Sequence, residues 1–199
     1  NLYVRHKALK KRKTYSQNQE DLFINNYFKE KKNGFYIDIG CYHPIKYSNT
    51  ALLYNRGWKG INIDMNQTSI DLFNIFRRRD KNICAAISNK QKTTTMYFDH
   101  LFSPVNTLDK NFSNVASKKI SFNHPIEKKV YTWKFNEVVQ KHNIDIKQID
   151  FINIDVEAHD LEVLEGIDLS IFNAKMICIE LANDQNNIKD KKLNEYLKK

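Results

Sequence analysis

The sequence predicts an α/β domain built on a mostly parallel central sheet, and two observations carry this prediction. Short runs that are apolar on both faces recur along the chain, which is typical of strands buried in a parallel sheet. Stretches with apolar residues at helical spacing alternate with these runs. This order gives strand–helix–strand units with right-handed crossovers, so we expect the sheet to be flanked by helices.

The first two elements are a helix and a buried strand. Ser16 and Gln19 fit a capping box, and apolar residues at helical spacing follow, which predicts a helix from Gln17 to about Lys31. Residues 35–40 then form an almost wholly apolar run bounded by glycines, which indicates a central strand.

The alternation continues up to residue 98. A short helix at 50–56 has Ser48 or Asn49 as its candidate cap and a glycine after its end. Apolar residues on one side predict a helix at 69–78. Three further runs predict strands at 60–64, 83–87 and, with an alternating and more exposed pattern, 93–98.

Residues 99–127 break this rhythm. They hold two of the three prolines and many Ser and Asn residues, so we expect a long loop or lid with little regular structure. Loops of this length in a compact domain usually serve function. Beyond them the same patterns predict a strand at 129–132, a helix at 135–142, a strand at 150–155, a helix at 159–165, a strand at 175–181 and a lysine-rich helical end.

The formal net charge of +9 lies at the two ends of the chain. Residues 1–13 hold six basic side chains and no acid, and residues 188–199 hold five basic and two acidic ones. Removing these from the totals of 32 and 23 leaves 21 basic and 21 acidic side chains in residues 14–187. We therefore expect a basic lead, one neutral domain and a basic tail. A neutral domain argues against nucleic acid as a partner, and the basic ends favour contact with an anionic membrane or a lipid-linked glycan.

The composition favours a single globular domain in a reducing compartment. At 41% hydrophobic and 12% aromatic residues the chain can bury a full core. Three scattered cysteines, Cys41, Cys84 and Cys178, are interpreted as reduced core thiols. No run is long enough to span a bilayer, and no apolar stretch follows the basic N-terminus as in a signal peptide. We therefore expect a cytoplasmic protein, at most peripheral to a membrane.

Two strand ends have the spacing of an adenosine-binding site. Gly40 ends the first strand, and Asp64 ends the second strand 24 residues later, where an acid can accept hydrogen bonds from ribose hydroxyls. The alternative is that Asp64 caps a helix. The loop lacks the second and third glycines of a dinucleotide fingerprint, and Pro44 keeps His43 out of the helical region. This argues against NAD, FAD and P-loop nucleotides, whereas S-adenosylmethionine has no phosphates to cradle.

At this point four segments together resemble the FkbM-type methyltransferases, a branch of the class I enzymes that use S-adenosylmethionine. The resemblance covers most of the chain, from about residue 15 to residue 181. It rests on Ser16-Gln17 with Glu20-Asp21; on 34–40 with His43-Pro44 and 48–50; on 57–64; and on 150–157 with 161–166.

The resemblance implies a Rossmann-like class I methyltransferase fold and a set of cofactor-binding residues. It implies that the segment around Gln17 folds over the cofactor, that the first loop contacts it, and that Asp64 binds its ribose. The implied cofactor-binding residues are Gln17, Asp38, Gly40, Cys41, Asp64, Met65, Ala86 and Ser88. The C-terminal antiparallel hairpin of class I enzymes is not predicted, because the 18 residues after Leu181 do not resemble two strands.

Candidate catalytic residues follow the strand at 150–155. Methyl transfer to a hydroxyl needs a base to take its proton, and Asp155, Glu157 and His159 alternate at this strand end. We rank the two carboxylates first, His159 third, and add His43 from the cofactor loop. The alternative for Glu157 and its neighbour is stabilisation of the next helix N-terminus. A metal site of Asp155, Glu157 and His159 is chemically possible but not expected. The family usually has Gly where this chain has Ala158.

The resemblance implies an O-methyltransferase whose acceptor is a sugar hydroxyl in a surface glycan precursor or a small natural product. Two alternatives remain open at this stage. One is an RNA or other nucleic-acid methyltransferase guided by the basic ends. The other is a non-catalytic module that retains the fold.

Overall fold

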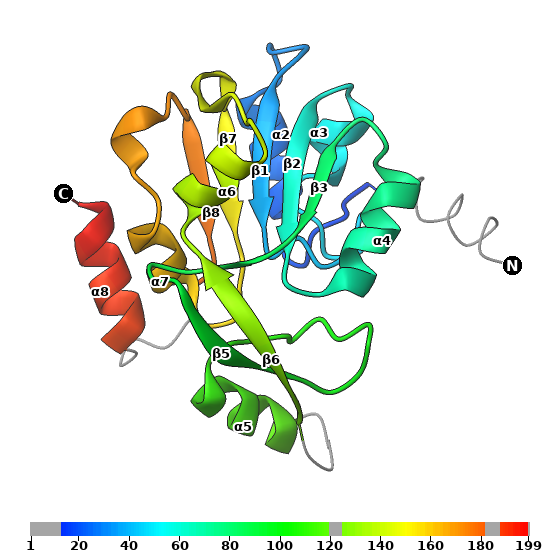
Figure 1. Cartoon of the computed structure of the whole chain (residues 1–199). Helices are drawn as coiled ribbons and strands as arrows, with labels where there is room; N and C mark the ends of the chain where they lie inside the picture. Colours follow the sequence, from blue (N-terminus) through cyan, green and yellow to red (C-terminus); the bar gives the residue numbers. More distant parts are fainter. Residues whose placement is uncertain (1–12, 120–124, 182–187, 199) are drawn as a thin grey trace, which may run out of the picture.

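The computed structural model describes residues 13–119, 125–181 and 188–198 and contains a five-stranded parallel sheet (Figure 1). The strand order is β3-β2-β1-β7-β8, and each neighbouring pair runs parallel. The strands are β1 (Phe35–Ile39), β2 (Lys59–Asp64), β3 (Lys81–Cys84), β7 (Phe151–Ile154) and β8 (Met176–Ile179). The predicted α/β, Rossmann-like architecture is therefore confirmed.

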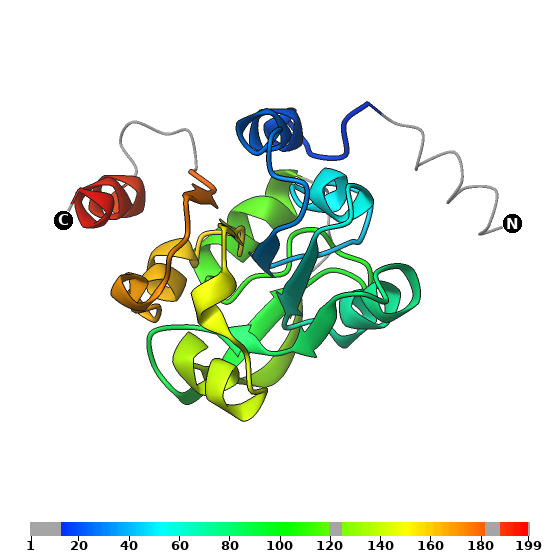
Figure 2. The ribbon, with the colours of Figure 1, turned by 90° about the horizontal axis from the view of Figure 1, so that it is seen from above.

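Helices cover both faces of this sheet, as the view along the strands shows (Figure 2). On one face lie α2 (Glu20–Tyr27), α3 (Ala51–Asn55) and α4 (Gln67–Phe76), and on the other lie α6 (Phe135–Lys141), α7 (Asp160–Glu165) and α8 (Ile188–Leu197). Two short 3-10 turns, η1 (Ile146–Gln148) and η2 (Leu169–Ile171), precede β7 and β8.

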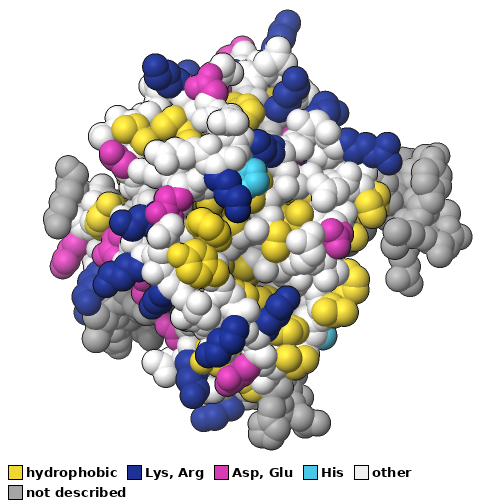
Figure 3. Space-filling view, in the orientation of Figure 1, with side chains coloured by type: hydrophobic (Ala, Val, Ile, Leu, Met, Phe, Trp, Pro, Cys, Tyr) yellow, Lys and Arg dark blue, Asp and Glu magenta, His cyan; other side chains and the backbone are white. Residues whose placement is uncertain are grey.

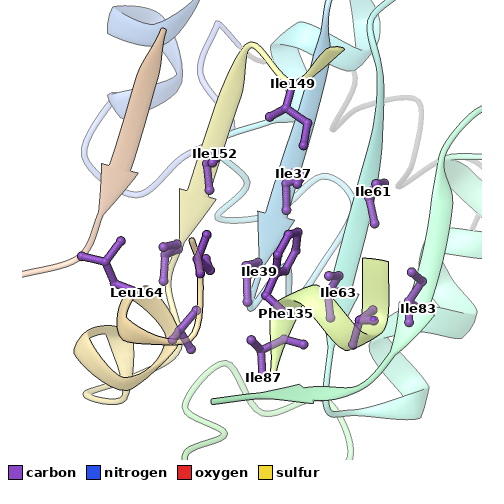
Figure 4. Packing of buried hydrophobic residues seen from close by; sticks show 14 of the residues in the cluster. Ile37, Ile39, Ile61, Ile63, Ile83, Ile87, Phe135, Ile149, Ile152 and Leu164 are labelled. Atoms are coloured by element: carbon purple, nitrogen blue, oxygen red, sulfur yellow. The ribbon is translucent and has the colours of Figure 1, made fainter. Parts of the chain in front are cut away.

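Alternate residues of the strands build two cores. Every second strand side chain, such as Ile37, Ile61 and Ile152, packs under α6 and α7 (Figure 4). On the opposite face Tyr36 packs with Trp58 and residues of α2 and α3. Period-two alternation in a sheet that is buried on both sides explains why the strand sequences are almost continuously apolar.

A second, three-stranded sheet lies at the carboxyl end of the first. Two of the predicted strands differ from the observed ones because of it. Its order is β4-β6-β5, with β4 (Ala86–Ile87), β5 (Lys92–Phe98) and β6 (Ile126–Trp133). The predicted strand 83–87 is divided at Ala85, because the two halves pair with different partners: Ile83 with β2, and Ile87 with Trp133. The predicted strand 129–132 is longer, since β6 pairs antiparallel with β5 along seven residues.

The predicted loop 99–127 contains a helix. The helix α5 (Lys110–Lys119) begins after Asp109, whose carboxylate accepts from the N–H groups of Asn111 and Phe112. The prediction missed this helix because its three apolar residues, Phe112, Val115 and Ala116, lie in a stretch rich in Ser and Asn, which indicated a loop. The segment 99–108 remains irregular and crosses the carboxyl end of the main sheet.

The first helix is shorter than predicted, and two predicted caps act elsewhere. Helix α2 begins only at Glu20, because Gln19 adopts a left-handed conformation with φ 69°. Thr50 precedes α3, and its side chain makes no capping hydrogen bond to the helix. The side chain of Ser48 binds Arg77 and that of Asn49 binds Asn153, so both residues fix a loop instead of capping the helix.

The chain ends and two of the three cysteines agree with the prediction where the structure describes them. The basic lead lies almost entirely outside the described residues, and α8 confirms the helical end. Within the described residues no strand follows β8. Cys41 is buried and Cys178 partly buried, but Cys84 is exposed, so the prediction of three core thiols is wrong for Cys84. No described helix has the length and apolar character of a membrane span.

Candidate functional site

A cavity lies where the carboxyl ends of β1, β2 and β7 meet. Seven of the predicted site residues line it, and the segment 103–108 covers it with Ser103, Pro104, Asn106 and Leu108. The seven lining residues are Gly40, Asp64, Met65, Ala86, Asp155, Glu157 and His159. The strand order places them together, because β1 lies between β2 and β7 in the sheet.

Gly40 is the point of closest approach between two of these strand ends. Its φ is +81°, and a Cβ atom at this position would lie 1.7 Å from the backbone oxygen of Asp155. Its N–H donates to the carbonyl of Ile63 at 2.8 Å. Only glycine combines this conformation with this approach, so the turn leaves the backbone itself as the floor of the cavity.

Asp64 is held by backbone donors and faces the cavity. Its two carboxylate oxygens accept from the N–H groups of Tyr42 at 2.9 Å and Asn66 at 2.7 Å. Burial raises the pKa of Asp64 to about 6. The alternative role as helix cap belongs instead to Asn66, whose side chain accepts from Thr68 in the first turn of α4. A carboxylate has about four acceptor positions, so Asp64 retains capacity for the hydroxyls of a ligand.

The cavity wall beside Asp64 is apolar with one free acceptor. Met65, Ala86 and Ile87 line this wall, and Pro104 and Leu108 face it from the covering segment. The side-chain oxygen of Asn106 is buried here with no hydrogen-bond partner among the described residues. A buried unpaired oxygen next to an apolar slot suits a flat heterocycle that carries an amino group.

Two carboxylates that line the cavity, those of Asp155 and Glu157, form a cluster with the exposed Glu180, which lies outside the lining. Asp155, Glu157 and Glu180 each offer an oxygen, and these oxygens lie within 4.8 Å of one another. Asp160 lies close by, where its carboxylate accepts from the N–H of Val156 at 3.1 Å. Three oxygens at this separation are a set that a hard cation accepts, and the third ligand is Glu180 instead of the His159 considered from the sequence.

The carboxylates of this cluster raise one another's pKa values. Burial is the largest cause for each group, and the charged neighbours that add to it are other carboxylates. The pKa is about 8 for Glu157 and about 7 for Asp160. The pKa of Asp155 lies well above its usual value because of burial and the neighbouring charge of Glu180, to which it is hydrogen-bonded. This cluster therefore holds protons at neutral pH.

The turn that carries Glu157 has a strained backbone. Glu157 and the following Ala158 both have positive φ, 54° and 70°. This explains why glycine suits the position of Ala158. The hydroxyl of Thr107, on the covering segment, donates to the carbonyl of Glu157 at 2.6 Å. Strain of this kind persists only where the surrounding structure fixes it, and it is common at functional sites.

His159 lines the cavity with both ring nitrogens near partners. Its Nε2 lies 3.0 Å from the hydroxyl of Ser88, and its Nδ1 lies 3.6 Å from a carboxylate oxygen of Glu162. Ser88 is buried behind the histidine and does not line the cavity. The predicted residue Ser88 is thus placed to orient His159 instead of touching a ligand.

Asp38 is not at the cavity surface, because its side chain points into the opposite core. Its carboxylate accepts from the Thr50 hydroxyl at 2.6 Å and from the Asn153 amide at 2.9 Å. The Thr50 hydroxyl in turn accepts from the buried guanidinium of Arg77, which also binds the carbonyl of Pro44. The sequence did not reveal this network, which fixes the loop after Gly40.

The remaining predicted residues also lie outside the cavity lining. Cys41 is buried against Ile70 and Phe73 of α4. The Nδ1 atom of His43 accepts from the backbone N–H groups of Ile45 and Lys46, so this ring stabilises the loop that carries it. Gln17 is exposed ahead of α2.

The fold and the cavity together define the class of protein. A parallel sheet in this order, with a glycine turn after β1 and an acid as the last residue of β2, is a Rossmann-like α/β fold whose ligand site lies at the carboxyl ends of its strands. A family model described as "Methyltransferase FkbM domain" matches residues 38–199. The chain therefore belongs to the FkbM methyltransferase family. The match begins within β1 and does not include the segment around Gln17.

Other comparisons add nothing to this assignment. No curated protein matches the chain, and no solved structure does.

Proposed function

We propose that this protein transfers a methyl group from S-adenosylmethionine to a hydroxyl oxygen. One observation carries the proposal: a single cavity joins a nucleoside-type half, with Asp64 and the apolar wall, to a half lined by the partly buried carboxylates of Asp155 and Glu157. Family membership supports methyl transfer, and the two halves of the cavity support the cofactor and the hydroxyl acceptor.

The residues present fit the cofactor. Asp64 has acceptor capacity for the ribose hydroxyls, and the unpaired oxygen of Asn106 suits the adenine amino group. Met65 and Ala86 offer apolar contact to the ring, and Gly40 leaves room beside the backbone. When bound, S-adenosylmethionine supplies a methyl group on a positively charged sulfur, which suits a wall of carboxylates.

Glu157 is our candidate for the base that takes the proton from the acceptor hydroxyl. A base works best when its pKa lies near the working pH, and the pKa of Glu157 is about 8. Burial and the charge of Glu180 hold the pKa of Asp155 well above its usual value, and Asp155 shares a hydrogen bond with Glu180, so we assign it to positioning the acceptor. His159 is the third candidate, held by Ser88 and Glu162.

The covering segment 103–108 acts as a lid in this proposal. The free volume of the cavity is about 40 Å³, whereas sites for small molecules usually measure about 300–1,000 Å³. The lid must therefore move outward when the cofactor enters. The Thr107 hydroxyl ties it to the carbonyl of Glu157. Just before it in the chain, the carbonyl of Leu101 accepts from the Asn66 amide.

The acceptor class follows from the family resemblance. We propose a hydroxyl of a sugar in a surface glycan precursor, or of a small natural product, and a reaction in the cytoplasm. The free cysteines support a reducing compartment. The balance of 21 basic and 21 acidic side chains in residues 14–187 supports a small acceptor over nucleic acid.

The test is transfer of labelled methyl from S-adenosylmethionine to a panel of sugars, glycan precursors, natural products and RNA. We expect label in a hydroxyl-bearing small molecule, with a rate that rises with pH through about 8. Glu157→Gln should reduce the rate by about a hundredfold or more while S-adenosylhomocysteine still binds. Glu195→Gln, a change at an exposed site on α8, is the matched control. Label in RNA alone, or an unchanged rate in Glu157→Gln, would contradict the proposal.

A further inference from the structure

A second hollow lies at the opposite end of the main sheet, where the strands begin. Its volume is about 660 Å³, within the range of small-molecule sites. Four lysines line it: Lys31, Lys59, Lys147 and Lys175. They come from four separate places, namely the loop after α2, the first residue of β2, the η1 turn and the residue before β8.

This hollow holds an excess of positive charge that the protein does not neutralise. Asp150 is its only acidic lining residue, and the carboxylate of Asp150 pairs with the Lys31 ammonium at 2.6 Å. The side chains of Lys59, Lys147 and Lys175 make no hydrogen bond, ion pair or ring contact with the described residues. A neighbouring carboxylate would offset the charge of a lysine. Because these three ammonium groups have no such partner among the described residues, they create a positive field around the hollow.

Helix ends do not account for these lysines. Cations often lie at helix C-termini, where they satisfy free carbonyls. Here the carbonyls after α2 are already taken by Arg56, whose guanidinium donates to those of Phe28, Lys29 and Lys31. The lysine ammonium groups are therefore available to something outside the chain.

Amide groups add directional hydrogen bonding to this charge. Asn33 and Asn173 line the hollow, and neither side chain makes a hydrogen bond to another described residue. Figure 3 shows Lys and Arg side chains along the upper rim of the molecule, at the end where the strands of the sheet start. Lysine ammonium groups around a concave surface with free amides suit a compact oxyanion with several acceptor oxygens.

We propose that this hollow binds a phosphate-bearing ligand with at least two negative charges. The ligand sits on Lys59, Lys147 and Lys175, at the end of the sheet opposite the methyl-transfer cavity. The phosphate belongs either to a soluble molecule or to a lipid headgroup. The site does not depend on the proposed methyl transfer, because none of its lining residues lines that cavity.

The test uses the full chain and two phosphate probes at low salt. Calorimetry with pyrophosphate tests a soluble ligand, and co-sedimentation with phosphatidylcholine vesicles that contain phosphatidic acid tests a headgroup. Pure phosphatidylcholine vesicles and polyuridylate are the comparison ligands. Binding to pyrophosphate or to the acidic vesicles supports the site, and the pattern between these two arms identifies the source.

A matched pair of triple variants separates this site from general attraction between charges. Lys59→Gln with Lys147→Gln and Lys175→Gln removes the three free lysines. Lys92→Gln with Lys110→Gln and Lys128→Gln removes equal charge from exposed positions on β5, α5 and β6. Both variants keep the basic ends of the chain. We expect the first to lose about tenfold or more in affinity and the second less than about twofold.

Three results would overturn the proposal. One is that neither phosphate probe binds the unmodified chain, including the case in which polyuridylate alone does. The second is an equal loss of phosphate affinity in both triple variants. The third is unchanged phosphate affinity in the variant that lacks Lys59, Lys147 and Lys175. S-adenosylhomocysteine binding and thermal unfolding, measured on both variants, verify that each is folded, and a failure of methyl transfer would leave the phosphate result unaffected.

Discussion

The two ends of one parallel sheet differ in charge and in access to water. At the carboxyl end a covered cavity is lined by the partly buried carboxylates of Asp155 and Glu157, and at the amino end an open hollow presents lysines to solvent. Burial at the carboxyl end raises pKa values to about 7 and about 8. Removal from water raises the pKa of a carboxylate toward neutral pH, where it can take up and release a proton. A lysine that faces water instead offers its charge to a ligand.

The largest effect that separates the two ends should come from Gly40→Ala. A Cβ atom there would collide with the Asp155 carbonyl, and φ is +81°. We expect a loss of about 3 kcal/mol or more in the free energy of unfolding, together with loss of S-adenosylhomocysteine binding. Urea denaturation and calorimetry measure the two effects.

Gly57→Ala is the matched control for this variant. Gly57 also has positive φ, +99°, but nothing lies within 4 Å of a Cβ atom built there. It should cost only about 1 kcal/mol and leave cofactor binding unchanged. Equal effects of the two substitutions would show that close approach at Gly40 does not shape the cavity.

The second largest effect is a decrease in the free energy of unfolding as the pH rises. It is expected from the carboxylates at the carboxyl end of the sheet and not from the lysines at the amino end. Glu157 and Asp160 titrate near 4 in the unfolded chain but at about 8 and about 7 when folded. Between these values the folded state binds more protons, so the free energy of unfolding should decrease from pH 5 to pH 9 by at least about 1 kcal/mol.

Glu157→Gln should flatten this pH profile and make the protein more stable than the unmodified chain at pH 9. The exposed substitution Glu195→Gln should leave the profile as it is. Urea unfolding at several pH values measures this difference. Stability that rises toward pH 9 in the unmodified chain would contradict the raised pKa values of Glu157 and Asp160.

The smallest effect concerns the lid over the closed end. The Thr107 hydroxyl donates to the Glu157 carbonyl and accepts from the N–H of Asp109. Thr107→Val removes both bonds and should speed the association of S-adenosylhomocysteine severalfold while costing about 1 kcal/mol in stability. Thr107→Ser keeps the hydroxyl and should behave like the unmodified chain in stopped-flow binding. Identical rates in all three proteins would mean that this tether does not hold the lid.

The sequence predicted the strand ends of the site better than the groups between them. Gly40, Asp64 and Asp155 follow apolar strands, so their positions at the cavity could be predicted from the chain alone. Glu180 could not, because its approach to Asp155 depends on β8 lying next to β7, and strand order is not written in a local pattern. Asp38 illustrates the converse, since it lies between Ile37 and Ile39 and period-two alternation points it to the opposite face.

The lid and the second sheet also could not be predicted from local sequence patterns. Helix α5 has only three apolar residues in a stretch rich in Ser, Asn and Lys, and Asn106 gains its importance only from the cavity that it covers. The lysine hollow is invisible in sequence, because its four lysines are spread from residue 31 to residue 175.

The most direct test of the central claim is calorimetry of S-adenosylhomocysteine with the unmodified chain and with Asp64→Ala. Asp64 is the buried carboxylate at the nucleoside-type half of the cavity, and its loss should weaken binding by about tenfold to a hundredfold. Asp71→Ala, on the exposed side of α4, should bind like the unmodified chain. Binding by the unmodified chain that is lost in Asp64→Ala is the predicted result. Absence of binding by the unmodified chain, or equal binding by both, would contradict the account.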